Sequence, residues 1–158
     1  MRLEGSCHCG AVRFSLTSQT PYPYMRCYCS ICRKTAGGGG YAINLMGAAD
    51  SLKIHGEDHI NVYQVRMPNG EQSPARRHFC RVCGSALWLF DPRWPELVHP
   101  FASAIDTPLP TPPTSSHIML DHVASWVEVF AGEEDETYPE YPEDSIEDWH
   151  RARALIVD

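Results

Sequence analysis

The stretch Cys27-Tyr28-Cys29-Ser30-Ile31-Cys32 places three cysteines within six consecutive residues of a 158-residue chain. Two more close-spaced clusters flank it, Cys7-His8-Cys9 before it and Cys80-Arg81-Val82-Cys83 after it. Together the three clusters contain all seven cysteines, and residues 84–158 contain none. Clusters with these spacings are typical of zinc sites, in which cysteine thiolates bind the metal at about 2.3 Å. The sequence therefore predicts a fold organised around metal.

The number of sulfurs indicates two different sites. Two complete four-cysteine sites would need eight thiols, and the chain has seven. The middle cluster is local, so we expect it to form a site of its own from Cys27, Cys29 and Cys32. The other four cysteines would then close a structural site that joins the N-terminal segment to a distant knuckle: Cys7, Cys9, Cys80 and Cys83.

Three protein ligands and one open position are the pattern of a catalytic zinc. A histidine could fill the fourth position instead and make a second structural site, with three candidates in the sequence: His78, His117 and His122. His8 is a poor donor if its segment is a strand, because it would then point away from Cys7 and Cys9. Zn²⁺ with three thiolates carries a formal charge of −1 and suits an incoming thiol, which loses its proton on coordination.

Composition and charge exclude several other classes of protein. A chain of this length fits one domain, 1–158, and its 43% hydrophobic residues are enough for a core. The formal net charge of −7 argues against nucleic-acid binding by a basic face. No signal peptide or membrane span is predicted, so we expect a cytoplasmic protein, in which structural disulfides are rare. Residues 133–148 hold nine acids and no Lys or Arg, and are expected to be a solvated surface.

The rest of the sequence predicts a mainly β fold. Val12, Phe14 and Leu16 alternate with polar residues, which is the period of a strand with one buried face. Further short strands are predicted at 24–28, 41–46, 52–55, 61–67, 77–80, 86–90, 101–105, 117–120 and 125–130. Residues 107–116 form a proline-rich connector that must be extended. Near the end, Ser145 can cap a short helix whose residues Ile146, Trp149 and Arg153 pack on the β body, so the segment 133–158 is expected to belong to the same domain.

The cysteine clusters and their neighbours resemble the glutathione-dependent formaldehyde-activating enzyme family, which also includes centromere protein V. The matching stretches are Gly5-Ser6-Cys7-His8-Cys9-Gly10-Ala11-Val12-Arg13-Phe14, Cys27-Tyr28-Cys29-Ser30-Ile31-Cys32-Arg33-Lys34 and Phe79-Cys80-Arg81-Val82-Cys83-Gly84-Ser85. A weaker match follows at His117-Ile118-Met119-Leu120 and Trp126-Val127. The resemblance implies a tent-like arrangement of small antiparallel sheets with two zinc ions.

Carried over residue by residue, the resemblance assigns the structural zinc to Cys7, Cys9, Cys80 and Cys83, and the functional, catalytic zinc to Cys27, Cys29 and Cys32. The reaction that it implies is of the carbon–sulfur lyase type, in which glutathione and formaldehyde form S-hydroxymethylglutathione. Two alternatives remain at this stage. One is a non-catalytic zinc module that binds glutathione or a protein partner, and the other is a thiol redox protein without metal.

Two features beside the middle cluster bear on the substrate. The run Gly37-Gly38-Gly39-Gly40 stands where the family more usually has one glycine and then bulkier residues, so it is either an open wall of the site or a plain loop. Arg26, Arg33 and Lys34 could meet the carboxylates of a glutathione-like ligand, although each alone is more typical of solvated surface.

Overall fold

The computed structural model describes residues 1–158 and shows three small sheets. The first is built on β2 (Arg13–Thr17), where the predicted alternation buries Phe14 and Leu16. Strand β2 pairs antiparallel with β1 (Arg2–Ser6) on one side and with β6 (Lys53–His55) on the other. This sheet presents its buried residues to the second sheet, and Phe14 packs edge-on against Trp88 at a ring distance of 5.1 Å.

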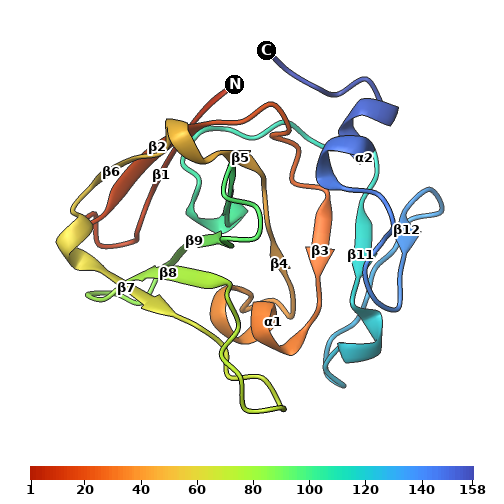
Figure 1. Ribbon diagram of the computed structural model, residues 1–158. Coiled ribbons are helices and arrows are strands. Elements are labelled where there is room, and N and C mark those ends of the chain that lie inside the picture. The colour runs from red at the N-terminus through yellow and green to blue at the C-terminus, as the bar shows by residue number, and fades with distance from the viewer.

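The second sheet has five antiparallel strands, in the order β5 (Gly47–Ala48), β10 (Leu97–Pro100), β9 (Ala86–Phe90), β8 (Arg76–Cys80) and β7 (Ile60–Tyr63). The third has the order β12 (Glu136–Thr137), β11 (Ser116–Ile118), β3 (Met25–Cys27) and β4 (Ala42–Ile43). Strand β11 runs parallel to both β3 and β12, so this sheet is mixed. In Figure 1 the first and third sheets lie at opposite sides of the molecule, with β8 and β9 between them.

Helices are few and short. Helix α1 (Ser30–Ala36) follows β3 directly, and α2 (Ile146–Ala152) lies near the C-terminus. Single 3₁₀ turns connect other strands: η1 (Ala49–Ser51), η2 (Glu57–His59), η3 (Ala102–Ala104) and η4 (Leu120–His122). No helix is long and apolar enough to cross a membrane. The predicted class, mainly β with small sheets and a short C-terminal helix, is confirmed.

Two of the predicted strands are wrong. Within the predicted strand 101–105, residues Ala102–Ala104 form η3, because Phe101 and Ala104 are the buried positions and their spacing of three suits a 3₁₀ turn. Residues 125–130 contain no strand, and both Trp126 and Phe130 are exposed, so no partner face stabilises an extended pairing there. Helix α1 was not predicted, since its seven residues are too few to show a periodic pattern.

The core is divided into two apolar clusters, and each contains cysteines. The larger lies between the first and second sheets and includes Leu3, Phe14 and Trp88 together with Cys7 and Cys80. The smaller lies beside the third sheet and is formed by Cys27, Cys32, Ala42, Phe101, Ile118 and Met119. Each group of buried thiols is therefore held by its own apolar surroundings.

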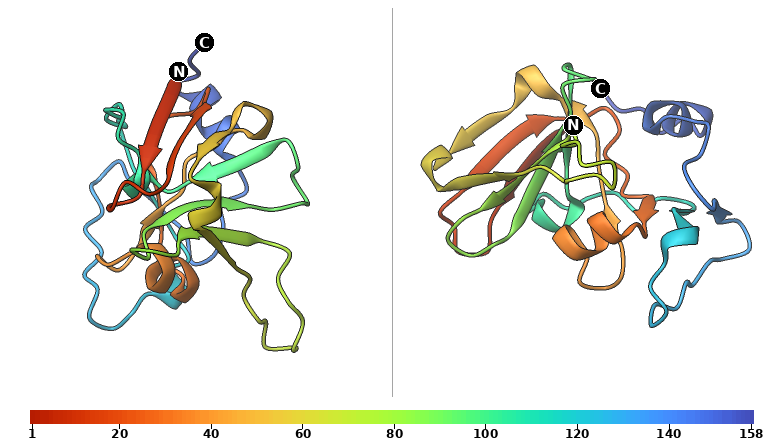
Figure 2. Two further views of the ribbon diagram at one scale, coloured as in Figure 1. Left: turned by 90° about the vertical axis from the view of Figure 1, so that its left-hand side faces the viewer. Right: turned by 60° about the horizontal axis from the view of Figure 1, so that its bottom comes forward.

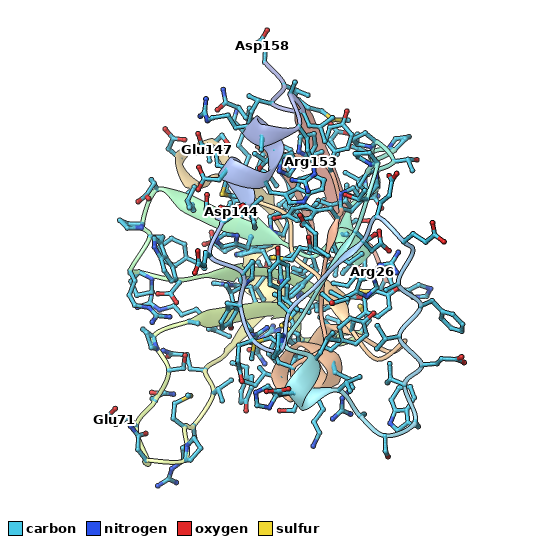
Figure 3. The ribbon with its side chains drawn as sticks, turned by 90° about the vertical axis from the view of Figure 1, so that its right-hand side faces the viewer. Arg26, Glu71, Asp144, Glu147, Arg153 and Asp158 are labelled. Carbon is cyan, nitrogen blue, oxygen red and sulfur yellow. The ribbon has the colours of Figure 1, made fainter.

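Helix α2 begins as the sequence predicts. The Ser145 hydroxyl accepts a hydrogen bond from the backbone N–H of Asp148, and the Asp148 carboxylate accepts one from the backbone N–H of Ser145, which completes a capping box. Trp149 is buried and stacks on Tyr24 at a ring distance of 3.6 Å, and the guanidinium of Arg153 covers its other face at 4.3 Å. Figure 3 labels Glu147 on this helix and Arg153 at its C-terminal end.

The two chain ends lie close together in both views of Figure 2. The amino group of Met1 donates a hydrogen bond to the backbone oxygen of Asp158 at 2.9 Å. Part of the acidic segment is also bonded to the rest of the chain. The Glu136 carboxylate accepts from the Arg153 guanidinium and from the Ser116 hydroxyl, each at 2.8 Å. The segment is thus more than a solvated surface, although a single domain over 1–158 stays a prediction.

Asp135, from the same acidic segment, anchors a buried polar chain. Its carboxylate accepts from the backbone N–H groups of Ser115 at 2.7 Å and Gly132 at 2.9 Å, and from Nε2 of His117 at 3.4 Å. His117 is completely buried, and its Nδ1 accepts from the Tyr28 hydroxyl at 2.9 Å. The backbone N–H groups of Ser115 and Gly132, and then the His117 ring, hold the pKa of Asp135 below its ordinary value.

Replacing Asp135 by alanine is expected to destabilise the protein by about 2 kcal/mol at pH 7, because hydrogen bonds to a charged acceptor are lost. The folded-state pKa of Asp135 is lowered, so its charge contributes stability above about pH 4 and loses it as pH falls toward the folded-state pKa. Urea denaturation of both proteins across pH measures this, with Glu134→Ala as the control for a neighbouring exposed acid. A gap between Asp135→Ala and wild type that widened in acid would contradict the assignment.

Candidate metal centres

Four cysteines from two distant parts of the chain meet at one point between the first two sheets. Their sulfur atoms all lie within 4.8 Å of one another, with 3.5 Å between Cys7 and Cys9 and 3.8 Å between Cys9 and Cys80. Cys7 and Cys80 are buried, whereas Cys9 and Cys83 are exposed. The structure thus brings together the four residues that the sequence grouped, and it could hold one metal ion there.

The local geometry at Cys7 and Cys9 differs from the expectation. These residues lie in the turn between β1 and β2, closed by a hydrogen bond from the Gly10 N–H to the Cys7 oxygen, and not in a strand. The turn still directs both sulfurs to one side, and His8 is exposed and takes no part in the cluster. The exclusion of His8 therefore holds in the structure for a reason other than strand alternation.

The knuckle at Cys80 and Cys83 is held by Ser85. The Cys80 N–H donates to the Ser85 backbone oxygen at 2.9 Å, and the Gly84 N–H donates to the Cys80 oxygen at 2.8 Å. The Ser85 hydroxyl lies 3.2 Å from the Cys83 sulfur, and this hydroxyl together with the Ser85 N–H lowers the pKa of Cys83 to about 5. A thiol of low pKa is readily available as a thiolate ligand.

The second cluster consists of Cys27, Cys29 and Cys32, whose sulfurs also lie within 4.8 Å of one another. Cys27 ends β3, and Cys32 lies in the first turn of α1. Cys29 is the N-cap of that helix, and its sulfur accepts from the Cys32 N–H at 3.3 Å. Hydrogen bonds from the other two thiols, Cys27 first, lower the pKa of Cys29 to about 2, and the same sharing raises the pKa of Cys27.

No histidine or carboxylate joins the three thiols. His117 has both ring nitrogens occupied, by Tyr28 and Asp135. His122 is bonded to Glu140 at 3.0 Å. His78 stacks on Trp88 in the second sheet, and it lies outside the cluster. All three candidates for a fourth ligand are therefore engaged elsewhere, and the protein supplies three donors.

A residue missed by the sequence reasoning, Arg77 of β8, contacts the second cluster. Its two terminal guanidinium nitrogens lie 3.8 and 3.9 Å from the Cys32 sulfur. Arg77 lies three residues before Cys80, so β8 reaches both clusters. The predicted cations lie differently: Arg26 covers the Tyr41 ring at 5.4 Å, and Arg33 and Lys34 are the basic residues in the last turn of α1. Only the position of β8 in the folded chain could reveal Arg77.

In the run Gly37–Gly40, the two end glycines lie against other residues and the two middle glycines have open space around them. A side chain at Gly37 would meet the backbone oxygen of Tyr41, and one at Gly40 would meet Val127, while Gly38 and Gly39 have open space around them. Gly40 also has a φ of +100°, which L side chains rarely adopt. The loop therefore packs closely against Val127 at its Gly40 end and has open space around its middle.

Replacing Gly40 by alanine is expected to cost about 1–3 kcal/mol of stability, because the backbone angle is strained and Val127 must move. Gly38→Ala is the matched control, since it adds the same methyl group to the same loop in open space and should change stability by less than about 0.5 kcal/mol. Thermal unfolding of the two variants compares them. Equal melting temperatures would show that the Val127 contact does not constrain the loop.

The fold and these two thiol clusters define a cysteine-rich, mainly β protein with two candidate metal centres, one of four donors and one of three. The chain belongs to the family of the glutathione-dependent formaldehyde-activating enzyme, whose model matches residues 2–121. This confirms the resemblance seen in the sequence.

The similarity extends over almost the whole chain. A protein of Halomonas elongata that carries the family's name is 62% identical over 155 residues, which cover 98% of each chain. A crystal structure of a Rhodobacter sphaeroides protein is similar in fold, with a TM-score of 0.54 and 27% identity, and covers 68% of this chain and 91% of its own. The part of the chain that follows the family match includes the acidic segment and α2.

Proposed function

We propose that the two cysteine clusters each hold one Zn²⁺ ion. Cys7, Cys9, Cys80 and Cys83 offer four thiolates, which is the donor set of a closed structural site. The cluster joins the β1–β2 turn to β8 and the knuckle that follows it, so the metal would tie the first sheet to the second. Its role in this proposal is to hold the fold together.

Cys27, Cys29 and Cys32 would hold the functional zinc, and the fourth coordination position would be left for a substrate. Such a centre has a formal charge of −1, which the neighbouring guanidinium of Arg77 would balance. When bound, the metal would favour the deprotonated form of an incoming thiol. The residues of the chain would position that thiol, and the apolar neighbours Ala42, Phe101 and Ile118 would limit water around it.

The function that this site supports best is a zinc-dependent reaction of the carbon–sulfur lyase type between a glutathione-like thiol and a small aldehyde. In the direction of synthesis the thiol sulfur bonds to the carbonyl carbon, the carbonyl double bond opens and its oxygen takes up a proton, as in S-hydroxymethylglutathione formation. The observation that carries this proposal is the cluster of three thiols without a fourth protein donor. The family and the name of the Halomonas elongata relative support glutathione and formaldehyde as the reactants.

The test is the rate of S-hydroxymethylglutathione formation from glutathione and formaldehyde, followed by NMR exchange spectroscopy with and without the zinc-loaded protein. We expect a rate above the spontaneous one, lost with a chelator and restored by zinc. Two bound zincs without acceleration would refute catalysis and favour a non-catalytic module that binds glutathione or a protein. A protein that binds no metal and forms disulfides readily would be a redox protein instead.

A further inference from the structure

Two cavities adjoin the metal centres and share part of their walls. One has a volume of about 280 Å³ and contains Arg77, the residue that contacts Cys32. The other, of about 460 Å³, contains Cys7 of the four-cysteine cluster. Thr35 of α1 and Ala86 of β9 line both. The cavities therefore border each other at these two residues, and their combined volume falls within the size range of small-molecule sites.

The smaller cavity has a mainly apolar surface, with Arg77, His78 and Thr35 as its polar residues. Tyr63, Phe79, Ala86 and Phe101 are four of its eight lining residues. Phe101 also packs in the apolar cluster around Cys27 and Cys32, so this cavity lies next to the three thiols. Its one guanidinium is that of Arg77. Such surroundings suit a short carbon chain that carries a sulfur, with an anionic group near the arginine.

The larger cavity is polar and has the opposite charge. Hydroxyl groups of Ser6, Ser85 and Ser103 line it, and the acid in its wall is Asp106. The Asp106 backbone is fixed by its N–H, which donates to the Glu4 oxygen at 2.8 Å. Its carboxylate is exposed and makes no ion pair within the chain, unlike Asp91, which is paired with Arg93 at 2.6 Å. Hydroxyls and a free carboxylate suit peptide groups and an ammonium ion.

We propose that these two cavities form one groove that binds a zwitterionic thiol of peptide size, with the sulfur toward Cys32 and Arg77 and the ammonium group at Asp106. The inference rests on the proposed function, because it takes the three-cysteine centre as the place of the sulfur. It adds the site of the substrate's body and names Asp106 as the residue that recognises a free amino group. Thr35 and Ala86 form the passage between the two ends.

Titration calorimetry with the zinc-loaded protein tests the ammonium end. We expect Asp106→Asn to weaken glutathione binding about fivefold, which is the affinity that an exposed ion pair contributes. The binding of N-acetylglutathione should stay unchanged, because this ligand has no ammonium group. Asp121→Asn is the control, since it removes the same charge from the exposed turn η4, outside both cavities. Equal glutathione affinity in Asp106→Asn and wild type would overturn the groove and leave the proposed function intact.

A second variant tests the passage. Ala86→Leu fills the junction of the cavities and should weaken glutathione binding more than that of 2-mercaptoethanol, which needs only the sulfur end. Circular dichroism checks that Ala86→Leu folds, and Asp106→Asn decides alone if it does not. Equal weakening of both thiols would contradict the passage, and a wild-type protein that binds neither thiol would refute the proposed function itself.

Discussion

Replacing Cys29 by serine should remove one of two bound zinc ions and reduce the thiol–aldehyde rate to the uncatalysed value, while the protein stays folded. The Cys29 sulfur is one of three donors, and two donors with no further protein ligand hold zinc poorly. The fold should survive because the same sulfur caps α1, and serine is a preferred N-cap residue that can accept from the Cys32 N–H. Metal analysis and the formaldehyde–glutathione rate are measured on one sample.

The matched control for this variant is Ser30→Ala, which changes the adjacent exposed residue and no thiol. It should keep two zincs and the wild-type rate. Retention of both metals by Cys29→Ser would contradict the three-cysteine centre. Loss of metal with full activity would separate the metal from the reaction and refute the proposed role of the site.

Replacing Cys80 by serine should instead destabilise the whole protein, by at least about 3 kcal/mol. Cys80 is completely buried in the larger apolar cluster, and its sulfur is one of four that join the β1–β2 turn to β8. Because the unfolded chain has no preformed site, the free energy of zinc binding there stabilises the folded state directly. Loss of the ligand would remove that stabilisation and lower the melting temperature.

Chelation separates the effect of the metal from that of packing. Without zinc, the difference between wild type and Cys80→Ser should shrink to about 1–3 kcal/mol, the cost of burying a serine hydroxyl in an apolar cluster. Val82→Ser in the exposed middle of the same knuckle is the control and should melt like wild type. An unchanged melting temperature in zinc-loaded Cys80→Ser would contradict a structural role for the four-cysteine centre.

Much of the site could be predicted from the sequence because metal ligands are recognised by residue type and spacing. The partition of the seven cysteines into four and three matches the two clusters in the structure. Strand β9 and the capped helix α2 are also predictable, since the short apolar run Ala86–Phe90 and the cap at Ser145 are local features.

The remaining features depend on contacts between distant residues. Arg77 contacts Cys32, 45 positions away, only because the second sheet packs beside α1. The sequence cannot show whether His117 is free to bind the metal, because its hydrogen-bond partners lie on other segments of the chain. These partners are Tyr28 and Asp135. Residues 101–105 form a short apolar segment that predicts a strand, yet the burial of Phe101 and Ala104 favours a 3₁₀ turn between them. Similarly, the parallel pairing of β11 with β3 follows from the path of the chain and has no local signature.

X-ray absorption at the zinc edge tests the central claim most directly. One centre of four sulfurs and one of three predict two zincs per chain with an average of about 3.5 sulfurs per zinc at about 2.3 Å. Adding glutathione should raise the average to about 4, as its sulfur completes the three-cysteine centre. A single zinc per chain, or an average that does not rise with glutathione, would contradict a thiol-binding zinc centre at Cys27, Cys29 and Cys32.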